Sequence, residues 1–255
     1  MPLSGFATTA NEGVARLTRD ELTMYFSGLE GAAKTSDLYV ATRTSVSQPF
    51  GAPTRLSVSS DTGIEYDPTI SPNWLTLVFT STRDGPQRIY AATRASTTAD
   101  FGVPSAMAGV APANAADVDA QPFITSDGQD LWFCSTRAGG LGAADIWKST
   151  QSGSGFGAPV LVPELNSAAA EALPVLSYDK LTVYFSSNRP GSQGLDVWRA
   201  HRSTVRDGFG TAVRVPELSL AGDDYASWIS PDNCRLYMAS SNNGNVDIYV
   251  AQRTP

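Results

Sequence analysis

The chain has 255 residues, of which 42% are hydrophobic, and its 25 acidic and 18 basic residues give a net charge of −7. This composition supports a hydrophobic core, and the lack of a basic stripe argues against nucleic acid as a partner. One histidine and two cysteines form no His/Cys zinc cluster and no obvious Ser-His-Asp arrangement, and no apolar run reaches the ~18 residues that a membrane span needs.

One sequence pattern occurs five times: an apolar residue, a short polar turn, and then a run of β-branched and aromatic residues. The copies begin at Leu17, Ile70, Ile124, Leu176 and Ile229. A fixed period of about 53 residues is typical of an array of identical supersecondary units. We therefore expect most residues that the copies share to serve the unit itself.

The elements of one unit are clearest in the fourth copy. In chain order they are a short apolar strand (174–177), a turn (178–180), a second strand (181–187), a polar loop (188–194), a third strand (196–202) and a fourth strand (212–216). Four short strands between turns, without helical periodicity, predict one antiparallel sheet.

A single sheet of this kind has half-apolar faces and open edges, whereas five sheets arranged radially bury their faces against one another. The sequence therefore predicts an all-β fold, a five-bladed β-propeller of four-stranded antiparallel blades that forms a single domain over residues 1–255. The repeat copies start near Glu12, Glu65, Asp119, Glu171 and Asp224.

The two ends of the chain predict how the ring closes. The last element is a third strand (247–253) with no fourth strand behind it. At the other end, Phe6 precedes Glu12 by the same spacing as Leu165 precedes Glu171. We therefore expect the N-terminal segment (3–6) to pair with the last blade and to supply its fourth strand.

The fourth copy resembles a known repeat. Its residues Glu-Ala-Leu-Pro-Val-Leu-Ser-Tyr-Asp (171–179), Leu-Thr-Val-Tyr-Phe-Ser-Ser-Asn-Arg-Pro-Gly (181–191) and Leu-Asp-Val-Trp (195–198) are similar to the WD40-like PD40 repeat of TolB-type propellers and OmpA-associated bacterial envelope proteins. The resemblance covers nearly the whole chain. It departs from the pattern at the strand-end arginine, which is present as Arg83, Arg137 and Arg189 but replaced by Gly28 and Asn242.

The resemblance implies a bacterial propeller that works as a binding or scaffolding module, often in the periplasm or outside the cell, and it implies no single reaction. The chain begins without the basic and apolar segments of a signal peptide. We therefore expect a periplasmic or secreted location from the resemblance, while the sequence leaves a cytoplasmic one open.

One acidic residue recurs at the start of the first strand of every copy: Glu12, Glu65, Asp119, Glu171 and Asp224. Because first strands line the channel of a propeller, we expect these ring acids to converge on one channel mouth. They either clamp neighbouring blades by pairing with arginines and backbone, or hold Ca²⁺, or supply the carboxylates of a glycosidase. No motif requires a cofactor, and no copy stands out as a catalytic dyad.

The copies differ directly after the ring acids, and we expect the individual function there. Tyr66 and Asp67 follow in the second copy, Gln121 in the third and Tyr225 in the fifth. Tyrosines beside a carboxylate and an amide suit a sugar or a polar peptide end, although the two tyrosines could equally pack in the core. Further along these strands, we interpret Phe123 and Trp228 as packing between blades.

Trp74 lies in the first hairpin turn of the second copy, where other copies have Lys180 and Asn233. An exposed Trp in a turn is typical of an interface, so we expect Trp74 to contact a partner on the opposite face of the ring.

These observations favour a binding module that is monomeric and presents the ring acids, Tyr66, Asp67, Gln121 and Tyr225 to a polar small molecule, a glycan or an envelope protein. Two alternatives stay open. One is a carboxylate-dependent glycoside hydrolase or lyase, with or without Ca²⁺, and the other is a purely structural assembly domain.

Overall fold

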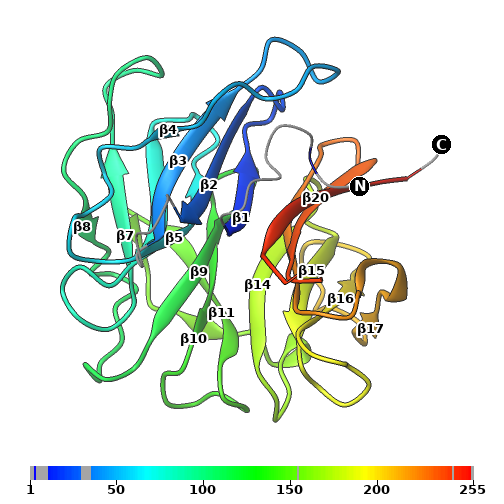
Figure 1. The fold of residues 1–255 in the computed structure, drawn as a ribbon. Helices are drawn as coiled ribbons and strands as arrows, with labels where there is room; N and C mark the ends of the chain where they lie inside the picture. Colours follow the sequence, from blue (N-terminus) through cyan, green and yellow to red (C-terminus); the bar gives the residue numbers. More distant parts are fainter. Residues whose placement is uncertain (1–2, 4–10, 30–35, 154, 243, 254–255) are drawn as a thin grey trace.

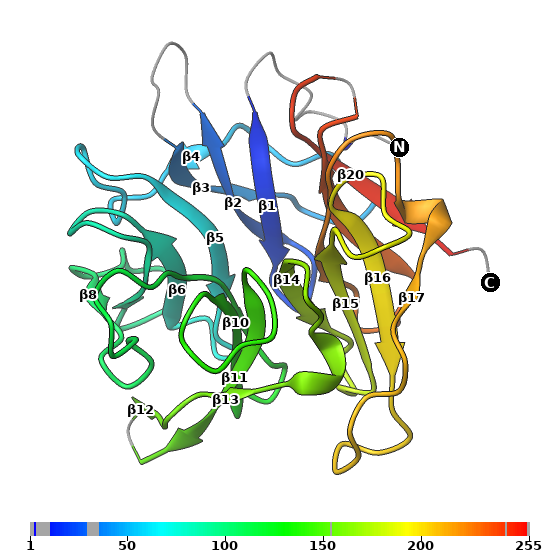
Figure 2. The ribbon, with the colours of Figure 1, turned by 90° about the horizontal axis from the view of Figure 1, so that it is seen from below.

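Each of the five sequence copies folds into one antiparallel sheet, and the sheets are arranged radially around a common axis in the computed structural model (Figures 1 and 2). The structure describes residues 3, 11–29, 36–153, 155–242 and 244–253. Neighbouring strands in a sheet follow one another in the chain, as in β1-β2-β3-β4. The predicted all-β, five-bladed propeller is therefore confirmed.

The strands fall into four positions, counted outward from the axis. The innermost strands are β1 (Glu12–Leu17), β5 (Glu65–Ile70), β9 (Asp119–Ile124), β14 (Glu171–Leu176) and β18 (Asp224–Ile229). The second strands are β2 (Thr23–Leu29), β6 (Thr76–Ser81), β10 (Asp130–Ser135), β15 (Thr182–Ser187) and β19 (Arg235–Ser240). The third strands are β3 (Ser36–Thr42), β7 (Arg88–Thr93), β11 (Asp145–Ser152), β16 (Asp196–His201) and β20 (Asp247–Gln252). The outer strands are β4 (Thr54–Arg55), β8 (Ser105–Ala106), β13 (Val160–Leu161) and β17 (Val213–Arg214), and β12 (Gly155–Phe156) also pairs with β11.

The hydrophobic core lies between the blades. Phe79 of β6 packs in one cluster with Leu38 of the first blade, and Phe133 of β10 packs in another with Ile89 of the second blade. Second strands are therefore covered on both faces, which explains why their sequences are nearly continuous apolar runs.

The ring closes through the N-terminal segment, as expected. The backbone N–H of Leu3 donates to the carbonyl of Ile248 in β20 at 2.9 Å. In the third blade the N–H of Val162 donates to the carbonyl of Ile146, which is equivalent to Ile248. Leu3 therefore occupies the place that the outermost segment takes in the other blades. β1 also contacts β18, β19 and β20. Residues 4–6 of the expected segment lie outside the described residues.

The outer strands are shorter than the sequence predicted. In the fourth blade β17 has two residues, whereas residues 212–216 were expected, and a 3₁₀ helix (η2, Pro216–Leu218) follows directly. A second 3₁₀ helix (η1, Pro163–Leu165) follows β13 in the same way. Proline has no N–H to donate to a strand ladder, so the strands end before it. Within the described residues, no helix has the length and apolarity that a membrane crossing needs.

One turn type joins the first and second strands and recurs around the ring. In the second blade the Ser71 hydroxyl donates to the side chain of Asn73 at 2.7 Å, and the same Asn73 oxygen accepts the N–H of Leu75 at 3.1 Å. This side-chain turn places Trp74 in the left-handed region, at φ 63°. Glu21, Lys180 and Asn233 have the same conformation in other blades.

Candidate functional site

Two pockets lie at opposite ends of the inner strands, and we call them the wide mouth and the narrow mouth. The wide mouth has a volume of about 470 Å³ and lies where the inner strands begin. Tyr66, Asp67, Gln121 and Tyr225 all line it, so the structure brings together the four copy-specific residues that the sequence singled out. Apart from Asp67, every described lining residue is uncharged.

Bulges in the inner strands shape the wide mouth. In β5 the pairing with β6 shifts between Tyr66 and Thr69, and Asp67, inside the shift, has φ 54°. Gln121 in β9 and Leu173 in β14 occupy the same place, with φ 62° and 50°. Residues other than glycine seldom adopt this conformation, and such backbone and bulges concentrate at functional sites.

Asp67 is the only charged side chain among the described residues of the wide mouth. It is 5% exposed. Burial raises the pKa of Asp67 to about 7, and the positive charge of Arg16 opposes this shift. No described residue donates a hydrogen bond to its carboxylate. Because a buried carboxylate without donors is unfavourable, Asp67 is suited to accept hydrogen bonds from a ligand.

The other copy-specific residues are positioned as neutral hydrogen-bonding groups. Oε1 of Gln121 accepts the N–H of Leu173 at 3.1 Å, which leaves the amide N–H groups of Gln121 as donors. The hydroxyl of Tyr225 donates to Asp223 at 3.4 Å. Burial, followed by the charge of Asp67, raises the pKa of Tyr66, so its half-buried phenol keeps its proton.

The five ring acids lie outside the lining of the wide mouth, and all are buried: Glu12, Glu65, Asp119, Glu171 and Asp224. Side chains alternate between the two faces of a strand. Tyr66, the second residue of β5, lines the pocket, so Glu65, the first, points away from it. The described lining of the wide mouth therefore gives no support to the expectation that five carboxylates converge there, which stays a prediction. Among the described residues, no three His, Cys, Asp or Glu side chains are grouped so as to hold a metal ion.

The ring acids of the three middle blades contact the chain that arrives from the preceding blade. Glu65 accepts the hydroxyl of Ser60 at 3.0 Å and pairs with Arg83 at 3.1 Å. Arg83 also donates to the carbonyl of Val58, in the segment between the first and second blades, at 2.7 Å. The same ion pair recurs as Asp119–Arg137 and Glu171–Arg189. This geometry fits the interpretation of these acids as clamps between blades.

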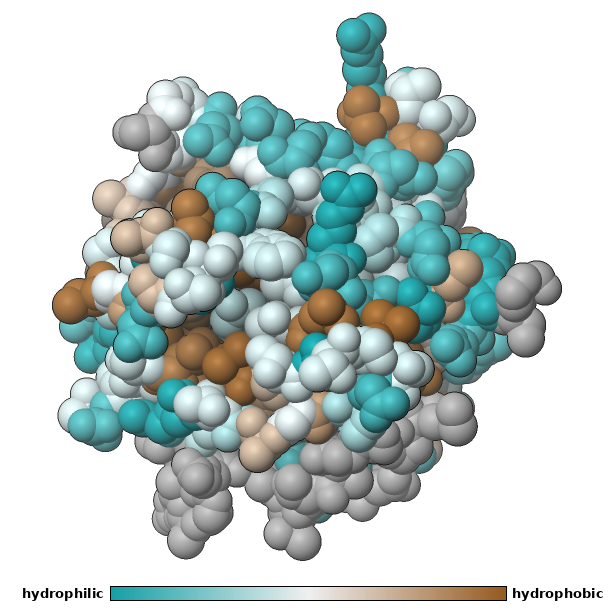
Figure 3. Space-filling view, turned by 90° about the horizontal axis from the view of Figure 1, so that it is seen from above, coloured by the Kyte–Doolittle hydropathy of each residue, from teal (hydrophilic) through white to brown (hydrophobic). Residues whose placement is uncertain are grey.

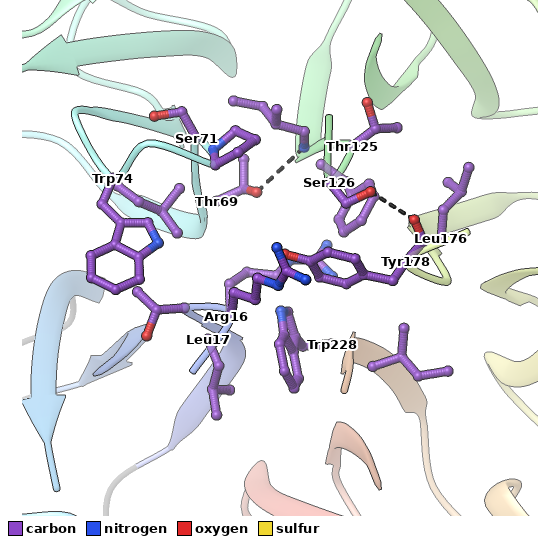
Figure 4. A pocket seen from close by; sticks show the side chains of 17 residues that line it. Arg16, Leu17, Thr69, Ser71, Trp74, Thr125, Ser126, Leu176, Tyr178 and Trp228 are labelled. Atoms are coloured by element: carbon purple, nitrogen blue, oxygen red, sulfur yellow. Dashed lines mark hydrogen bonds between the residues drawn. The ribbon is translucent and has the colours of Figure 1, made fainter. Parts of the chain in front are cut away.

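The narrow mouth has a volume of about 60 Å³ and lies among the turns that follow the inner strands (Figure 4). Trp74, expected at a partner surface on this face, is half-buried and forms part of the pocket wall. Phe123 and Trp228 are buried in the clusters between blades, as interpreted from the sequence, and they also line this mouth.

Arg16 is the channel residue that the sequence reasoning missed. It lies in β1, lines the narrow mouth and is only 1% exposed. The repeat contained a signal, because the equivalent positions of the other copies are uncharged: Thr69, Phe123, Val175 and Trp228. Because only the first copy has a charged residue at this position of the inner strand, Arg16 could have been recognised from the sequence as a residue that the repeat itself does not require.

No family profile matches the chain, and no curated protein sequence matches it. Solved structures do match. TolB from Acinetobacter baumannii superposes with a TM-score of 0.63 at 16% identity, over 95% of this chain and 52% of that chain, so this chain spans about half of its length.

Two glycoside hydrolases are also similar. A thermostable family-43 enzyme has a TM-score of 0.62 at 15% identity, over 99% of this chain and 92% of that chain. The GH62 α-L-arabinofuranosidase domain of Coprinopsis cinerea has a TM-score of 0.59 at 12% identity, over 100% of this chain and 95% of that chain. Likeness at these identities shows the fold alone, a β-propeller that resembles TolB and glycoside hydrolase propellers.

Proposed function

We propose that the protein is a ligand-binding propeller module of the WD40-like PD40 type. Its wide mouth binds a small polar ligand that carries a protonated amine, with an amino sugar as the best match. The observation that carries the proposal is Asp67, a buried carboxylate that lines a pocket of about 470 Å³ and receives no hydrogen bond from the described residues. A ligand ammonium supplies both the missing donors and the opposite charge.

The other lining residues fit the ring of such a ligand. The faces of Tyr66 and Tyr225 suit the apolar face of a sugar, and their hydroxyls suit its polar edge. Gln121 offers amide donors to ring hydroxyls. The volume of the wide mouth lies within the range of small-molecule pockets. The PD40 resemblance also supports a periplasmic or secreted location.

Binding is favoured over glycoside hydrolysis by the number of carboxylates. Glycosidases of the usual kind need two carboxyl groups that flank the scissile bond. Among carboxylates, the described lining of the wide mouth contains Asp67 alone, without any of the ring acids. The residues at hand therefore support recognition of a ligand rather than its cleavage.

The test is isothermal titration calorimetry of the full chain at pH 7.5 with glucosamine, and with N-acetylglucosamine as the same ring without the charge. We expect glucosamine to bind and N-acetylglucosamine to bind much more weakly. Asp67→Asn should weaken glucosamine binding at least ~10-fold. Asp100→Asn removes the same charge from an exposed loop and should leave the affinity unchanged. Equal affinities for the two sugars, no binding of either, or no effect of Asp67→Asn would contradict the proposal.

A further inference from the structure

The two channel mouths carry opposite charges. The described lining of the wide mouth contains one acidic residue, Asp67, and no basic one. The described lining of the narrow mouth contains two basic residues, Arg16 and Arg19, and no acidic one. In a protein with a net charge of −7, a pocket with only positive side chains attracts anions that the rest of the molecule repels.

Arg16 is buried without a hydrogen-bond acceptor. Its side chain is 1% exposed, and Nε, Nη1 and Nη2 have no partner among the described residues. The charge of Asp67 acts on Arg16, but no ion pair joins the two side chains. The ring of Phe123 lies 5.0 Å from the guanidinium carbon but offers no hydrogen-bond acceptor of its own. Buried N–H donors without an acceptor are strongly unfavourable, so an acceptor from outside the chain would stabilise this arrangement.

The neighbouring polar groups of the narrow mouth also offer donors. Oγ1 of Thr69 accepts the N–H of Ile124 at 3.4 Å and keeps its own proton for donation. The hydroxyl of Tyr178 has no partner among the described residues, and its ring lies 5.1 Å from the guanidinium carbon of Arg19. These groups, together with Arg16, present hydrogen-bond donors to one small space.

The remaining hydroxyls of the narrow mouth are already used. Those of Thr18, Ser71 and Thr125 each donate to the Asp or Asn two residues further along the same turn. Figure 4 shows Arg16, Tyr178 and Trp228 pointing toward one another in the middle of the pocket. The unused donors therefore lie around Arg16.

We propose that the narrow mouth is a binding site for one small oxyanion, held against the guanidinium of Arg16. Phosphate, sulfate and the carboxylate of a small organic acid share the required chemistry, because the planar guanidinium donates to two oxygens at once. A volume of about 60 Å³ admits a single group of this size. Because Arg16 is buried, entry of the anion requires side chains of the lining turns, such as Tyr178 and Arg19, to shift.

The test is calorimetric titration of the full chain with sodium phosphate, sodium sulfate and sodium acetate separately, which distinguishes inorganic oxyanions from a carboxylate. We expect saturable binding of at least one of them, and Arg16→Met should weaken that binding at least ~10-fold. Arg206→Met removes the same charge from an exposed outer loop and should leave the affinity unchanged. No saturable binding, or equal losses in both variants, would overturn the proposal.

Thermal unfolding gives an independent readout. Arg16→Met removes a buried charge without a partner, so without added anion we expect the variant to be at least as stable as the wild type. The bound anion should raise the Tm of the wild type and not that of the variant. A large loss of stability in Arg16→Met, with no effect of any anion on the wild type, would show that groups within the protein satisfy Arg16.

Should Arg16→Met fail to fold, Arg19→Ala carries the test, because Arg19 is exposed in a turn. It should weaken binding of the same anion several-fold at unchanged Tm, and unchanged anion affinity would contradict the site. The amine site of the wide mouth is tested with a different ligand and a different variant, so each proposal can fail without the other.

Discussion

Asp67 and Arg16 are opposite charges on neighbouring inner strands, β5 and β1, that do not form an ion pair. Burial lowers the pKa of Arg16 to about 9 and raises that of Asp67 to about 7, and in each case the other charge opposes the shift. Both shifts arise because the protein removes water without supplying hydrogen bonds in its place. Groups perturbed in this way concentrate at functional sites, which is why we assign one ligand to each.

The first prediction concerns the pH dependence of stability. The pKa of Asp67 is about 7 in the folded protein and near 3.8 in the unfolded chain. Between these values the folded state holds a proton that the unfolded state has released, so the contribution of Asp67 to stability falls as the pH rises from about 4 to about 7. Asp67→Asn removes this dependence, and we expect the variant to gain stability relative to the wild type by on the order of 3 kcal/mol between pH 4.5 and pH 8.

Urea unfolding of the wild type, Asp67→Asn and the exposed control Asp100→Asn at both pH values checks this prediction. The attraction between Asp67 and Arg16 acts only where Asp67 is ionised, and it already contributes to the pKa of about 7, so the expected change in stability includes it. A constant difference between wild type and Asp67→Asn at the two pH values would show that Asp67 is ionised at both.

At the scale of the elements, the ring acids and strand-end arginines join neighbouring blades. Asp119 is 1% exposed, and Arg137 donates to its Oδ1 at 2.7 Å. The same arginine reaches the carbonyl of Val110, in the segment that enters the third blade, at 2.7 Å, and its guanidinium carbon lies 5.3 Å from the ring of Trp147. One arginine thus holds a carboxylate, a backbone segment and an aromatic ring together.

The strand-end arginine Arg137 should therefore matter greatly for stability. Arg137→Met leaves the buried carboxylate of Asp119 without this partner, and we expect a loss of about 3–5 kcal/mol in the free energy of unfolding. The double variant Asp119→Asn with Arg137→Met should recover part of this loss, because no buried charge is left unpaired. Urea unfolding measures both, with Arg206→Met as the exposed control. If Arg137→Met unfolds like the control, the clamp interpretation is wrong.

The repeat predicted the blades because burial between neighbours is the same for every copy and fixes the same apolar pattern in each. It described the channel only in part, because the same reasoning placed the ring acids there together with Tyr66 and Asp67. The bulge in β5 breaks the simple alternation, so that Tyr66 and Asp67 both line the wide mouth while Glu65 points away. Arg16 was missed because the sequence alone does not show whether a charged residue in a strand is exposed to solvent or buried in the channel.

At the scale of the whole molecule, a non-covalent joint holds the ring together. Leu3 is 8% exposed and packs in the cluster that joins the first blade to the last, which contains Met24 of the first and Ile248 of the last. β1, which carries Arg16, contacts β18 across the same joint. The joint therefore supports both the stability of the ring and the position of the narrow mouth.

Leu3→Asp tests this joint by placing a carboxylate among apolar side chains. Burying an unpaired charge is unfavourable, so the joint should open rather than accept it, and we expect the Tm to fall by on the order of 5 °C or more. Val103→Asp makes a comparable change at a residue that is 94% exposed and should leave the Tm unchanged. Equal Tm values for Leu3→Asp and the wild type would mean that the ring holds without its N-terminal contact. A lowered Tm with weaker anion binding would show that closure of the ring also positions Arg16.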